Sequence, residues 1–551
     1  MSSKKFAAAL LLVLAVAMVV TSCQPAEKLE TVLNYNHGTE PPTLDPSLTT
    51  DTTSVLCTYN MFMGLTNLSK EDFQPEPWLA TKWDVSDDGL VYTFYMRKDV
   101  KWVQWDPAAQ KATEKRPVVA GDIEYGVKRV CNPETASDYA YVMYGIKGCE
   151  AVNTGETTDL DSIGVKAIDD YTVEFTLARP APWFPAIASM WTAYPLPREA
   201  IEEHGDLWTE PGNIWTHGPY VLDVWEHNNR MVWKKNPLWF DAKNVAIETV
   251  NFVMVQEEST AMAMYENGEL DTVGAPLADL DRIRADAVLS KELVTMPRLC
   301  QYYYGYNTTK PPFDNVKVRQ AFSYAVDRQK LIDDVLKGGQ LPAWSFAPDG
   351  IFGSVASDPD FPGITFDPQK GRDLLAEAGY PNGEGLPDIT LMFNTSEGHQ
   401  AIAEFIQRNW KENLGVEVKL ANQEWAVYLN TVHEDSPQVW RMGWCADYSD
   451  QNNWVTEVWH PTIGRNDAKW DPESPGAKRF MEVTEAAQTE TDPEKRKELY
   501  FEAEKILCAD EAVQIPIYYY TRLTMVKPYL ERTFDLAGGN EEIWNWKVKA
   551  H

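Results

Sequence analysis

The regular exchange of strands and helices after residue 300 constrains this chain most. A dense aromatic run over 302–307 predicts a strand, and apolar residues at helical spacing predict one helix over 315–336. The same alternation continues, with two more helices and two more strands predicted over 369–378, 399–414, 389–393 and 415–420. Strand–helix–strand order of this kind is typical of an α/β domain with a partly parallel sheet.

The chain is too long for a single ordinary core. With 551 residues, two or three domains are expected. Its 44% hydrophobic and 24% charged residues are those of a globular protein, and we find no internal repeat or low-complexity tract. The 21 Trp and 25 Tyr residues suit a binding cleft, because they offer large rigid faces, although most of them are expected in the core.

The net charge argues against one class of partner. The formal charge is −32 at pH 7, and a strongly acidic surface repels phosphate backbones and anionic lipid surfaces. Nucleic acid is therefore not expected as a partner.

The N-terminus predicts export. Lys4 and Lys5 precede an apolar run over 6–20, which is short for a membrane-spanning helix and is typical of a signal peptide over 1–22. The Val-Thr-Ser-Cys sequence that ends at Cys23 resembles a bacterial lipobox. We therefore expect lipidation of Cys23, a tether over 23–30 and no other membrane anchor. The alternative is a plain secretory signal with an incidental cysteine.

The cysteines predict neither a disulfide scaffold nor a metal site. Six remain besides Cys23, they are far apart in a long chain, and they form no CxxC pair or zinc-like cluster. An exported chain permits disulfides, and spacing alone makes Cys131 and Cys149 a candidate pair, but the sequence does not fix the pairing. No metal or cofactor is expected.

The stretch 441–450, with the sequence RMGWCADYSD, reads as a short strand that runs into an acidic turn. Gly443 leaves room for another backbone to approach, and Asp447 follows at the end of the strand. A strand edge with a carboxylate at its end can pair with a peptide main chain and its terminal ammonium. Taken alone, the stretch also reads as an ordinary strand followed by a solvated loop.

Motifs of enzymes are missing. The chain contains no phosphate-binding glycine loop of the GxxxxGK[ST] type, no HExxH, no GxSxG and no GxGxxG. Missing motifs do not exclude catalysis, but no group of residues argues for it, and we do not expect an enzyme.

Sequence landmarks along the whole chain resemble one known family. They include NYNHGTEPPTLDP (34–46), LDSIGVKAIDDYTVEFTL (160–177), LCQYYYGYNTTKPPF (299–313), NQEWAVYL (422–429) and RMGWCADY (441–448). The chain resembles the extracytoplasmic solute-binding proteins of the peptide/nickel family of ABC importers, and within that family the oligopeptide-binding branch.

The resemblance implies an α/β, three-lobed fold of the periplasmic-binding-protein type II. Two main lobes are joined by a two-strand hinge, and a third lobe is added. The implied lobes are lobe I (30–62, 198–299 and 514–551), lobe II (63–197) and lobe III (300–513). The chain would cross between lobes I and III near Leu299 and Val513, and closing this hinge would bury a ligand.

The resemblance also implies how a peptide would be held. Asp447 matches the aspartate that pairs with the α-ammonium of the peptide. The residues that match main-chain binding segments lie on two sides of the cleft, in lobe III and in lobe I. They are Gly443, Trp444 and Cys445 on the first side and Thr50, Asp51 and Thr52 on the second.

Further positions follow from the resemblance. Tyr139, Tyr303 and Trp425 match residues that line the cleft. Arg441 and His399 match residues that meet the peptide carboxylate, although Arg441 could instead form a salt bridge at the edge of the core and His399 could simply begin a helix. A disulfide is implied between Cys300 and Cys445. Charged residues of relatives that bind particular peptides are replaced here at three positions, by Thr50, Leu336 and Val432, which bears on the preferred peptide length.

The sequence thus predicts a monomeric receptor, outside the cytoplasm and anchored by lipidated Cys23, that binds short peptides and delivers them to the permease of an ABC importer. Two alternatives remain open. The same fold could bind a non-peptide ligand such as a nickel chelate, haem, an oligosaccharide or a cell-wall peptide. The protein could also be a surface lipoprotein that acts as a chaperone or adhesin.

Overall fold

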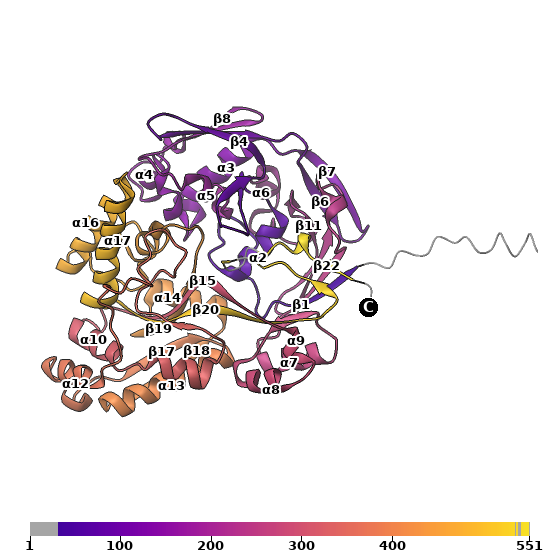
Figure 1. Ribbon diagram of the computed structural model, residues 1–551. Helices are drawn as coiled ribbons and strands as arrows, with labels where there is room; N and C mark the ends of the chain where they lie inside the picture. The colour runs from indigo at the N-terminus through magenta and orange to yellow at the C-terminus, as the bar shows by residue number, and fades with distance from the viewer. Residues whose placement is uncertain (1–30, 535, 538–540, 550–551) are drawn as a thin grey trace, which may run out of the picture.

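One large mixed sheet runs through the centre of the protein (Figure 1). The structure is a computed structural model that describes residues 31–534, 536–537 and 541–549. In sheet order, its strands are β11 (Tyr220–Glu226), β12 (Arg230–Lys235), β13 (Thr249–Val253), β1 (Val32–Asn36), β14 (Thr272–Gly274), β20 (Gln514–Val526), β15 (Leu293–Tyr306), β19 (Val439–Cys445), β17 (Ile389–Asn394) and β18 (Val418–Gln423), with β16 (Leu341–Pro342) beside β20.

Strands β15 and β20 join the two halves of this sheet. They are the long strands in the middle of Figure 1, with 14 and 13 residues, and they pair antiparallel. Their register shifts between Pro297 and Gln301. Before the shift β20 pairs with β14 on its outer side, and after the shift β15 pairs with β19 on its outer side. An irregularity therefore sits where the two halves of the sheet meet.

The aromatic run of β15 is explained by burial on both faces. Tyr302, Tyr304 and Tyr306 point into one core, where Tyr306 stacks on Phe313 with ring centroids 4.6 Å apart. Tyr303 points into the opposite core, where it packs against Trp459 at 5.4 Å. Successive strand residues face opposite sides, so a strand that is covered twice needs apolar residues at every position.

Helices α10 (Val316–Tyr324), α12 (Pro368–Glu377) and α13 (Glu397–Leu414) cover one side of the sheet, at the bottom of Figure 1. The single helix predicted over 315–336 is wrong, because α10 ends at Tyr324. Asp327 then caps α11 (Arg328–Leu331) through the backbone N of Lys330, at 3.0 Å. A π-helical turn, Ile332–Leu336, follows.

The break in that helix has a tertiary cause. Arg328 is buried, and its Nε donates to the carbonyl of Pro516 on β20, at 2.6 Å. The backbone N of Asp327 donates to Asn409 Oδ1 on α13, at 2.9 Å. Both partners lie far away in the sequence, and they hold the chain in a new direction.

A second, separate group of strands lies at the top of Figure 1. One antiparallel sheet contains β4 (Ala80–Val85), β5 (Val91–Met96), β9 (Thr172–Thr176) and β8 (Val165–Asp169). Another contains β10 (Trp215–Thr216), β6 (Lys101–Asp106) and β7 (Lys111–Pro117). Helix α3 (Ala120–Cys131) packs on β8, and a disulfide joins Cys131 to Cys149 at the start of α4 (Cys149–Asn153).

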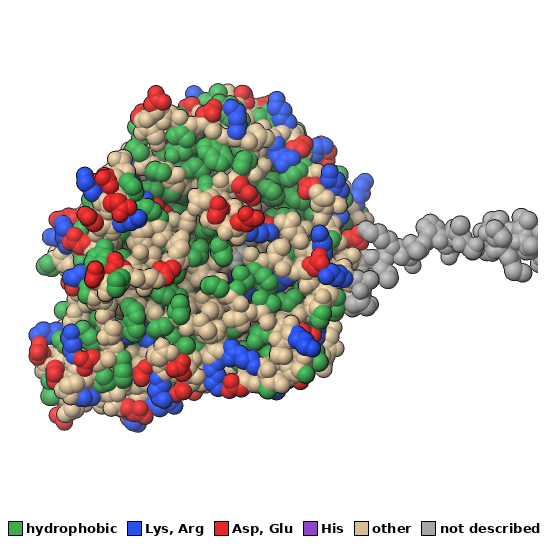
Figure 2. All heavy atoms as spheres, in the orientation of Figure 1, with side chains coloured by type: hydrophobic (Ala, Val, Ile, Leu, Met, Phe, Trp, Pro, Cys, Tyr) green, Lys and Arg blue, Asp and Glu red, His purple; other side chains and the backbone are tan. Residues whose placement is uncertain are grey.

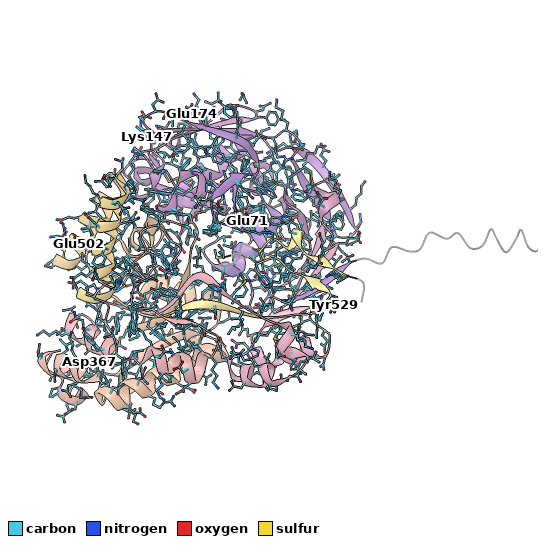
Figure 3. All side chains as sticks on the ribbon, in the orientation of Figure 1. Glu71, Lys147, Glu174, Asp367, Glu502 and Tyr529 are labelled. Atoms are coloured by element: carbon cyan, nitrogen blue, oxygen red, sulfur yellow. A yellow bond between two sulfur atoms is a disulfide. The ribbon has the colours of Figure 1, made fainter. Side chains whose placement is uncertain are left out.

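Helices α16 (Pro475–Thr489) and α17 (Pro493–Lys505) form a hairpin at the left of Figure 1. Glu502, labelled in Figure 3, pairs with Arg479 at 2.6 Å and links the two helices. The remaining α-helices and strands are α2 (Thr52–Met61), α5 (Phe184–Ile187), α6 (Arg198–His204), α7 (Glu258–Glu266), α8 (Leu280–Ala285), α9 (Leu289–Glu292), α14 (Trp425–Asp435), α15 (Val455–Trp459), β2 (Thr66–Leu68), β3 (Pro75–Pro77), β21 (Leu530–Glu531) and β22 (Lys547–Val548).

The predicted α/β class is confirmed by the mixed sheet and its covering helices. The predicted signal peptide, the tether over 23–30 and lipidation of Cys23 lie outside the described residues. Among the described residues, no helix is both long enough and apolar enough to span a membrane.

Two glycines of α3 test how tightly this helix is packed. A methyl group on Gly126 would overlap the carbonyl oxygen of Tyr194, whereas one on Gly121 would meet nothing within 4 Å. We expect Gly126→Ala to destabilise the protein by about 1–3 kcal/mol through overpacking. Gly121→Ala should be neutral or stabilise by up to about 1 kcal/mol, because alanine is the better helix former.

Urea unfolding of both variants, followed by far-UV circular dichroism, checks this pair. Gly121→Ala is the matched control, since it makes the same change in the same helix. Equal midpoints for the two variants would contradict the close approach of α3 to Tyr194.

Candidate functional site

Two adjoining cavities form a cleft beside the end of β19. Their volumes are about 610 Å³ and about 190 Å³. Sites for small ligands commonly occupy about 300–1,000 Å³, so the pair is large enough for a small organic ligand. Five residues line both cavities, namely Thr52, Arg298, Trp425, Arg441 and Tyr520.

Asp447 lies in the smaller cavity at the end of β19. Its Oδ2 accepts hydrogen bonds from Asn453 Nδ2 at 2.8 Å and from Tyr139 OH at 3.2 Å. Loss of solvent raises the pKa of Asp447 to about 7, although these two hydrogen bonds work in the opposite direction. Among the described residues, no Lys, Arg or His forms an ion pair with it. The site therefore holds a carboxyl group that a cation would stabilise in its charged form.

A second acid stands behind Asp447. Nδ2 of Asn453 also donates to Glu457 Oε2 at 2.8 Å, and Oδ1 of Asn453 accepts from the backbone N of Asp447 at 2.9 Å. Burial raises the pKa of Glu457 to about 8, so this acid is mostly protonated at neutral pH. Asn453 thus holds both the side chain and the backbone of Asp447.

The edge of β19 leaves backbone groups for a ligand. On one side, residues Val439–Cys445 pair with β15. On the other side, pairing with β17 reaches only Val439 and Trp440. Within the described part of the chain, residues 441–445 have no strand on this second side, and Gly443, Trp444 and Cys445 line the smaller cavity. An unpaired strand edge can accept an extended chain as an added strand.

A disulfide ties this edge to the rest of the sheet. Cys300 and Cys445 lie directly opposite each other on β15 and β19, and they form the bond that the family resemblance implies. Leu299, beside Cys300, accepts a hydrogen bond from the backbone N of Ala446 at 2.9 Å. The backbone is therefore held up to the residue before Asp447.

The segment that faces β19 is the start of a helix and not a strand. Thr50, Asp51 and Thr52 line the smaller cavity, and Asp51 caps α2 through the backbone N of Thr53 at 2.9 Å. The indole Nε1 of Trp425, on the other side of the cleft, donates to Asp51 Oδ1 at 3.1 Å. This segment can thus offer its first-turn groups to a ligand, but it cannot form a regular ladder.

The aromatic residues that the resemblance implies come together here. Tyr139, Tyr303 and Trp425 all line the smaller cavity. Tyr139 stacks on Trp444 with ring centroids 6.3 Å apart, so it places its hydroxyl beside Asp447. The site therefore has flat apolar walls with one acidic end.

Arg441 and His399 lie in the larger cavity. Arg441 donates to Asn394 Oδ1 at 3.0 Å and to Tyr520 OH at 2.5 Å, and its guanidinium lies 4.6 Å from the centre of the Tyr302 ring. Among the described residues it forms no ion pair with a carboxylate, so the core-edge salt bridge of the alternative assignment is not seen there.

His399 is uncharged. Loss of solvent and the nearby Arg441 hold its pKa well below the usual range. It occupies the first turn of α13, as its alternative assignment proposed, and it also lines the cavity. Of the two residues, only Arg441 brings charge to the larger cavity.

Sequence reasoning missed several residues of the cleft. Asn453 lies in the polar run that follows Asp447, which was the available signal for a supporting group. Arg298 is a charged residue inside β15, and no other feature of the sequence pointed to it. Arg465 carried no signal, since its role depends on an ion pair with Asp467 at 2.6 Å.

Comparison with known proteins identifies the family. The model of "Bacterial extracellular solute-binding proteins, family 5 Middle" matches residues 74–466. The oligopeptide-binding protein OppA of Bacillus subtilis is 36% identical over 508 residues, which cover 90% of this chain and 88% of OppA.

Solved structures give the same answer. The complex of Haemophilus influenzae OppA with the peptide RPPGFSPFR has a TM-score of 0.83 at 27% identity, covering 95% of this chain and 100% of that one. The murein tripeptide-binding protein MppA of Escherichia coli has a TM-score of 0.84 at 30% identity, covering 96% of this chain and 99% of that one. The unliganded open form of MppA reaches only 0.63, covering 96% and 98%.

The two TM-scores for MppA, 0.84 and 0.63, indicate which of the two MppA structures this chain resembles more. At equal sequence identity, the fold departs from the unliganded open form much more than from the other MppA structure. The OppA peptide complex, with a TM-score of 0.83, resembles this chain about as much as the MppA structure with the TM-score of 0.84 does. The α/β fold of the oligopeptide-binding type is thereby confirmed, and the matched family consists of binding proteins and not of enzymes. The chain belongs to family 5 of the bacterial extracellular solute-binding proteins.

Proposed function

We propose that this protein is a receptor that binds short peptides in the cleft and delivers them to an ABC oligopeptide importer. Asp447 carries the proposal, because a desolvated carboxyl with no cationic partner among the described residues is built to receive an ammonium group. The similarity to OppA, one structure of which holds a nonapeptide, supports the same conclusion.

The peptide would lie along the edge of β19. Its main chain would pair with residues 441–445, so that binding would depend little on the peptide sequence. Asp447 lies just beyond the end of this strand, six residues after Arg441, or about 20 Å in extended backbone. That span fits a peptide of about four to six residues between an ammonium at Asp447 and a carboxylate at Arg441.

The three implied lobes remain part of the proposal. The register shift in β15 and β20 is a natural hinge between lobes I and III. Several hydrogen bonds cross between the proposed lobes. They join Tyr139 to Asp447, Trp425 to Asp51, Thr39 to Glu424, Ser396 to Glu258 and Ser259 to Glu397.

Two of these contacts form a reciprocal pair. Glu258, at the start of α7, accepts from Ser396 Oγ at 2.9 Å, and Glu397, at the start of α13, accepts from the backbone N of Ser259 at 3.0 Å. Each glutamate therefore helps to cap the helix of the other lobe. Such contacts exist only when the lobes are closed, and a bound peptide would shift the population towards this state.

The anchor and the location complete the proposal. A lipid on Cys23 would hold the protein at the outer face of the membrane, where it would act as a monomer. The short tether over 23–30 would leave the cleft free to meet both peptides and the permease.

Peptides with a blocked amino terminus test the role of Asp447. Acetylation removes the ammonium and leaves the carboxyl without a partner, so we expect affinity to fall at least about 100-fold. Asp447→Asn should cause a similar loss for free peptides. Titration calorimetry on protein that has been unfolded and refolded, to remove retained ligand, gives both values.

Controls separate this result from misfolding. Asp388→Asn changes an exposed carboxyl that pairs with Lys419 and should bind like the wild type. Because folding raises the pKa of Asp447 from 3.8 to about 7, the resulting loss of stability grows as pH rises between these values and is complete above pH 7. Ligand-free Asp447→Asn should therefore melt at a higher temperature than the wild type at pH 8. Equal binding of free and acetylated peptides would contradict the proposal and point to a non-peptide ligand.

The affinity should also depend on pH with a defined sign. An ammonium binds the ionised carboxylate, and the pKa of Asp447 is about 7 before binding and lower afterwards. Below pH 7 binding therefore releases a proton, and affinity should fall up to about tenfold per pH unit. Above about pH 8 the free peptide amine loses its own proton, so affinity should peak between about pH 7 and pH 8.

Calorimetry in two buffers of different ionisation enthalpy measures the released proton. In Asp447→Asn, the fall in affinity on the acid side should be missing. A flat profile from pH 5 to 8 would refute this assignment.

A further inference from the structure

The smaller cavity holds charges of both signs, although the protein as a whole is strongly acidic. The chain has a formal charge of −32, and acidic and basic side chains are mixed on the face shown in Figure 2. The smaller cavity is balanced, because three aspartates and three arginines line it, namely Asp51, Asp447, Asp467, Arg298, Arg441 and Arg465. A cavity with both signs of charge suits a ligand that also carries both.

Arg465 uses only part of its guanidinium group inside the protein. Its side chain is 7% exposed, and its Nε donates to Asp467 Oδ2 at 2.6 Å. Among the described residues, none accepts a hydrogen bond from its Nη1 or Nη2. A guanidinium presents five N–H donors in a fixed fork. Four donors of Arg465 therefore remain for a group that enters the cavity.

The charge of Arg465 is only partly matched. Its partner Asp467 also accepts a hydrogen bond from Nδ1 of His433 at 3.3 Å, and Nε2 of His433 lies 3.3 Å from Asp138 Oδ1. Hydrogen bonds with Asp138 and Asp467 raise the pKa of His433 to about 9, so the imidazole is charged at neutral pH. Asp467 is thus shared between two cations, and a further anion would stabilise the charge of Arg465.

Contacts on two sides place Arg465 at the Asp447 end of the cleft. The backbone N of Arg465 donates to the carbonyl of Glu457 at 2.9 Å. The Glu457 side chain is in turn bonded to Asn453, which holds Asp447. On the other side, burial and the charge of Asp447 raise the pKa of Tyr139, and the charge of Arg465 acts in the opposite direction. Tyr139, whose hydroxyl donates to Asp447, therefore lies close to Arg465 as well.

The size of the cavity points to the first residue of a bound peptide. Its volume of about 190 Å³ is below that of common small-ligand sites, which occupy about 300–1,000 Å³, so it suits one side chain and not a whole peptide. The α-ammonium and the first side chain leave the same α-carbon, and the second side chain of an extended peptide points to the opposite face. A peptide with its ammonium at Asp447 can thus reach Arg465 with its first side chain.

We propose that Arg465 is a specificity-determining residue that binds the carboxylate of a Glu or Asp side chain at the first position of the peptide. The inference rests on the proposed function, because it takes the place of the ammonium from Asp447 and leaves the peptide C-terminus to Arg441. An acidic first residue would bring an ammonium to Asp447 and a carboxylate to Arg465. A charge-assisted bond to a guanidinium is strong enough to change affinity about tenfold.

Tetrapeptides that differ by one charge test this proposal. Calorimetry on the refolded protein at neutral pH would compare Glu-Ala-Ala-Ala with Gln-Ala-Ala-Ala, whose first side chains have nearly the same size. We expect the Glu peptide to bind about tenfold more tightly. Arg465→Met keeps a long side chain and removes the charge, so it should reduce this ratio to about twofold or less.

A second pair of peptides tests the position of the acidic side chain. Ala-Glu-Ala-Ala and Ala-Gln-Ala-Ala should bind equally well to the wild type and to Arg465→Met, because their second side chain points away from the cavity. A preference for Glu at the second position alone would overturn the assignment to the first side chain.

Further variants exclude misfolding as the cause. Arg465→Met breaks the ion pair with Asp467, so a double variant with Asp467→Asn removes both charges and should give the same low ratio. Arg465→Lys keeps the charge and loses the fork, so it should retain part of the ratio. Arg284→Met removes an exposed arginine of α8 outside both cavities and should leave the ratio unchanged. Each ratio is taken within a single variant, so a uniform loss of folded protein cancels.

Failure of this inference is distinguishable from failure of the proposed function. If the tetrapeptides bind but the Glu peptide has no advantage, or keeps its advantage in Arg465→Met, the role of Arg465 is refuted while peptide binding stands. If no peptide binds the wild type at all, the proposed function fails, and the inference fails with it.

Discussion

The carboxyl group of Asp447 is the constraint on which the rest of the cleft depends. Desolvation raises its pKa to about 7, and the hydrogen bonds from Asn453 and Tyr139 offset only part of this effect. Selection for stability alone would pair such a carboxyl group with a cation or expose it to water. Its neighbours instead fix its position and leave its charge unmatched within the described protein. In the proposed function the peptide ammonium is this missing partner, and the fold has already desolvated the carboxyl before the peptide binds.

The large sheet carries both the edge of the candidate site and the hinge that we propose. Strand β15 holds β19 in register and is bonded to it through Cys300 and Cys445, so the binding edge is rigid. The same strand, with β20, carries the register shift between Pro297 and Gln301 at the place where the two halves of the sheet meet. One pair of strands therefore holds the backbone edge of β19 and, in the proposed function, would also be the hinge between the two halves.

Local patterns were sufficient to predict much of this architecture. The aromatic run predicted over 302–307 is the end of β15 as far as Tyr306, because both of its faces are buried. The alternation of helices and strands predicted the α/β class. The break after Tyr324 could not be predicted, since Arg328 turns towards Pro516 and Asp327 towards Asn409, both far away in the sequence. The helix start at Asp51 was readable in principle, because Asp followed by Thr-Thr-Ser is a common N-cap pattern. Asn453 and Arg298 act through tertiary contacts that a sequence does not display.

A crystal structure of the protein with a bound tetrapeptide tests the central claim most directly. The account predicts that the α-nitrogen of the peptide lies about 2.7–2.9 Å from a carboxylate oxygen of Asp447, with the peptide backbone paired to residues 441–445. A peptide bound in the opposite direction, with its carboxylate or a side chain at Asp447, would contradict the account.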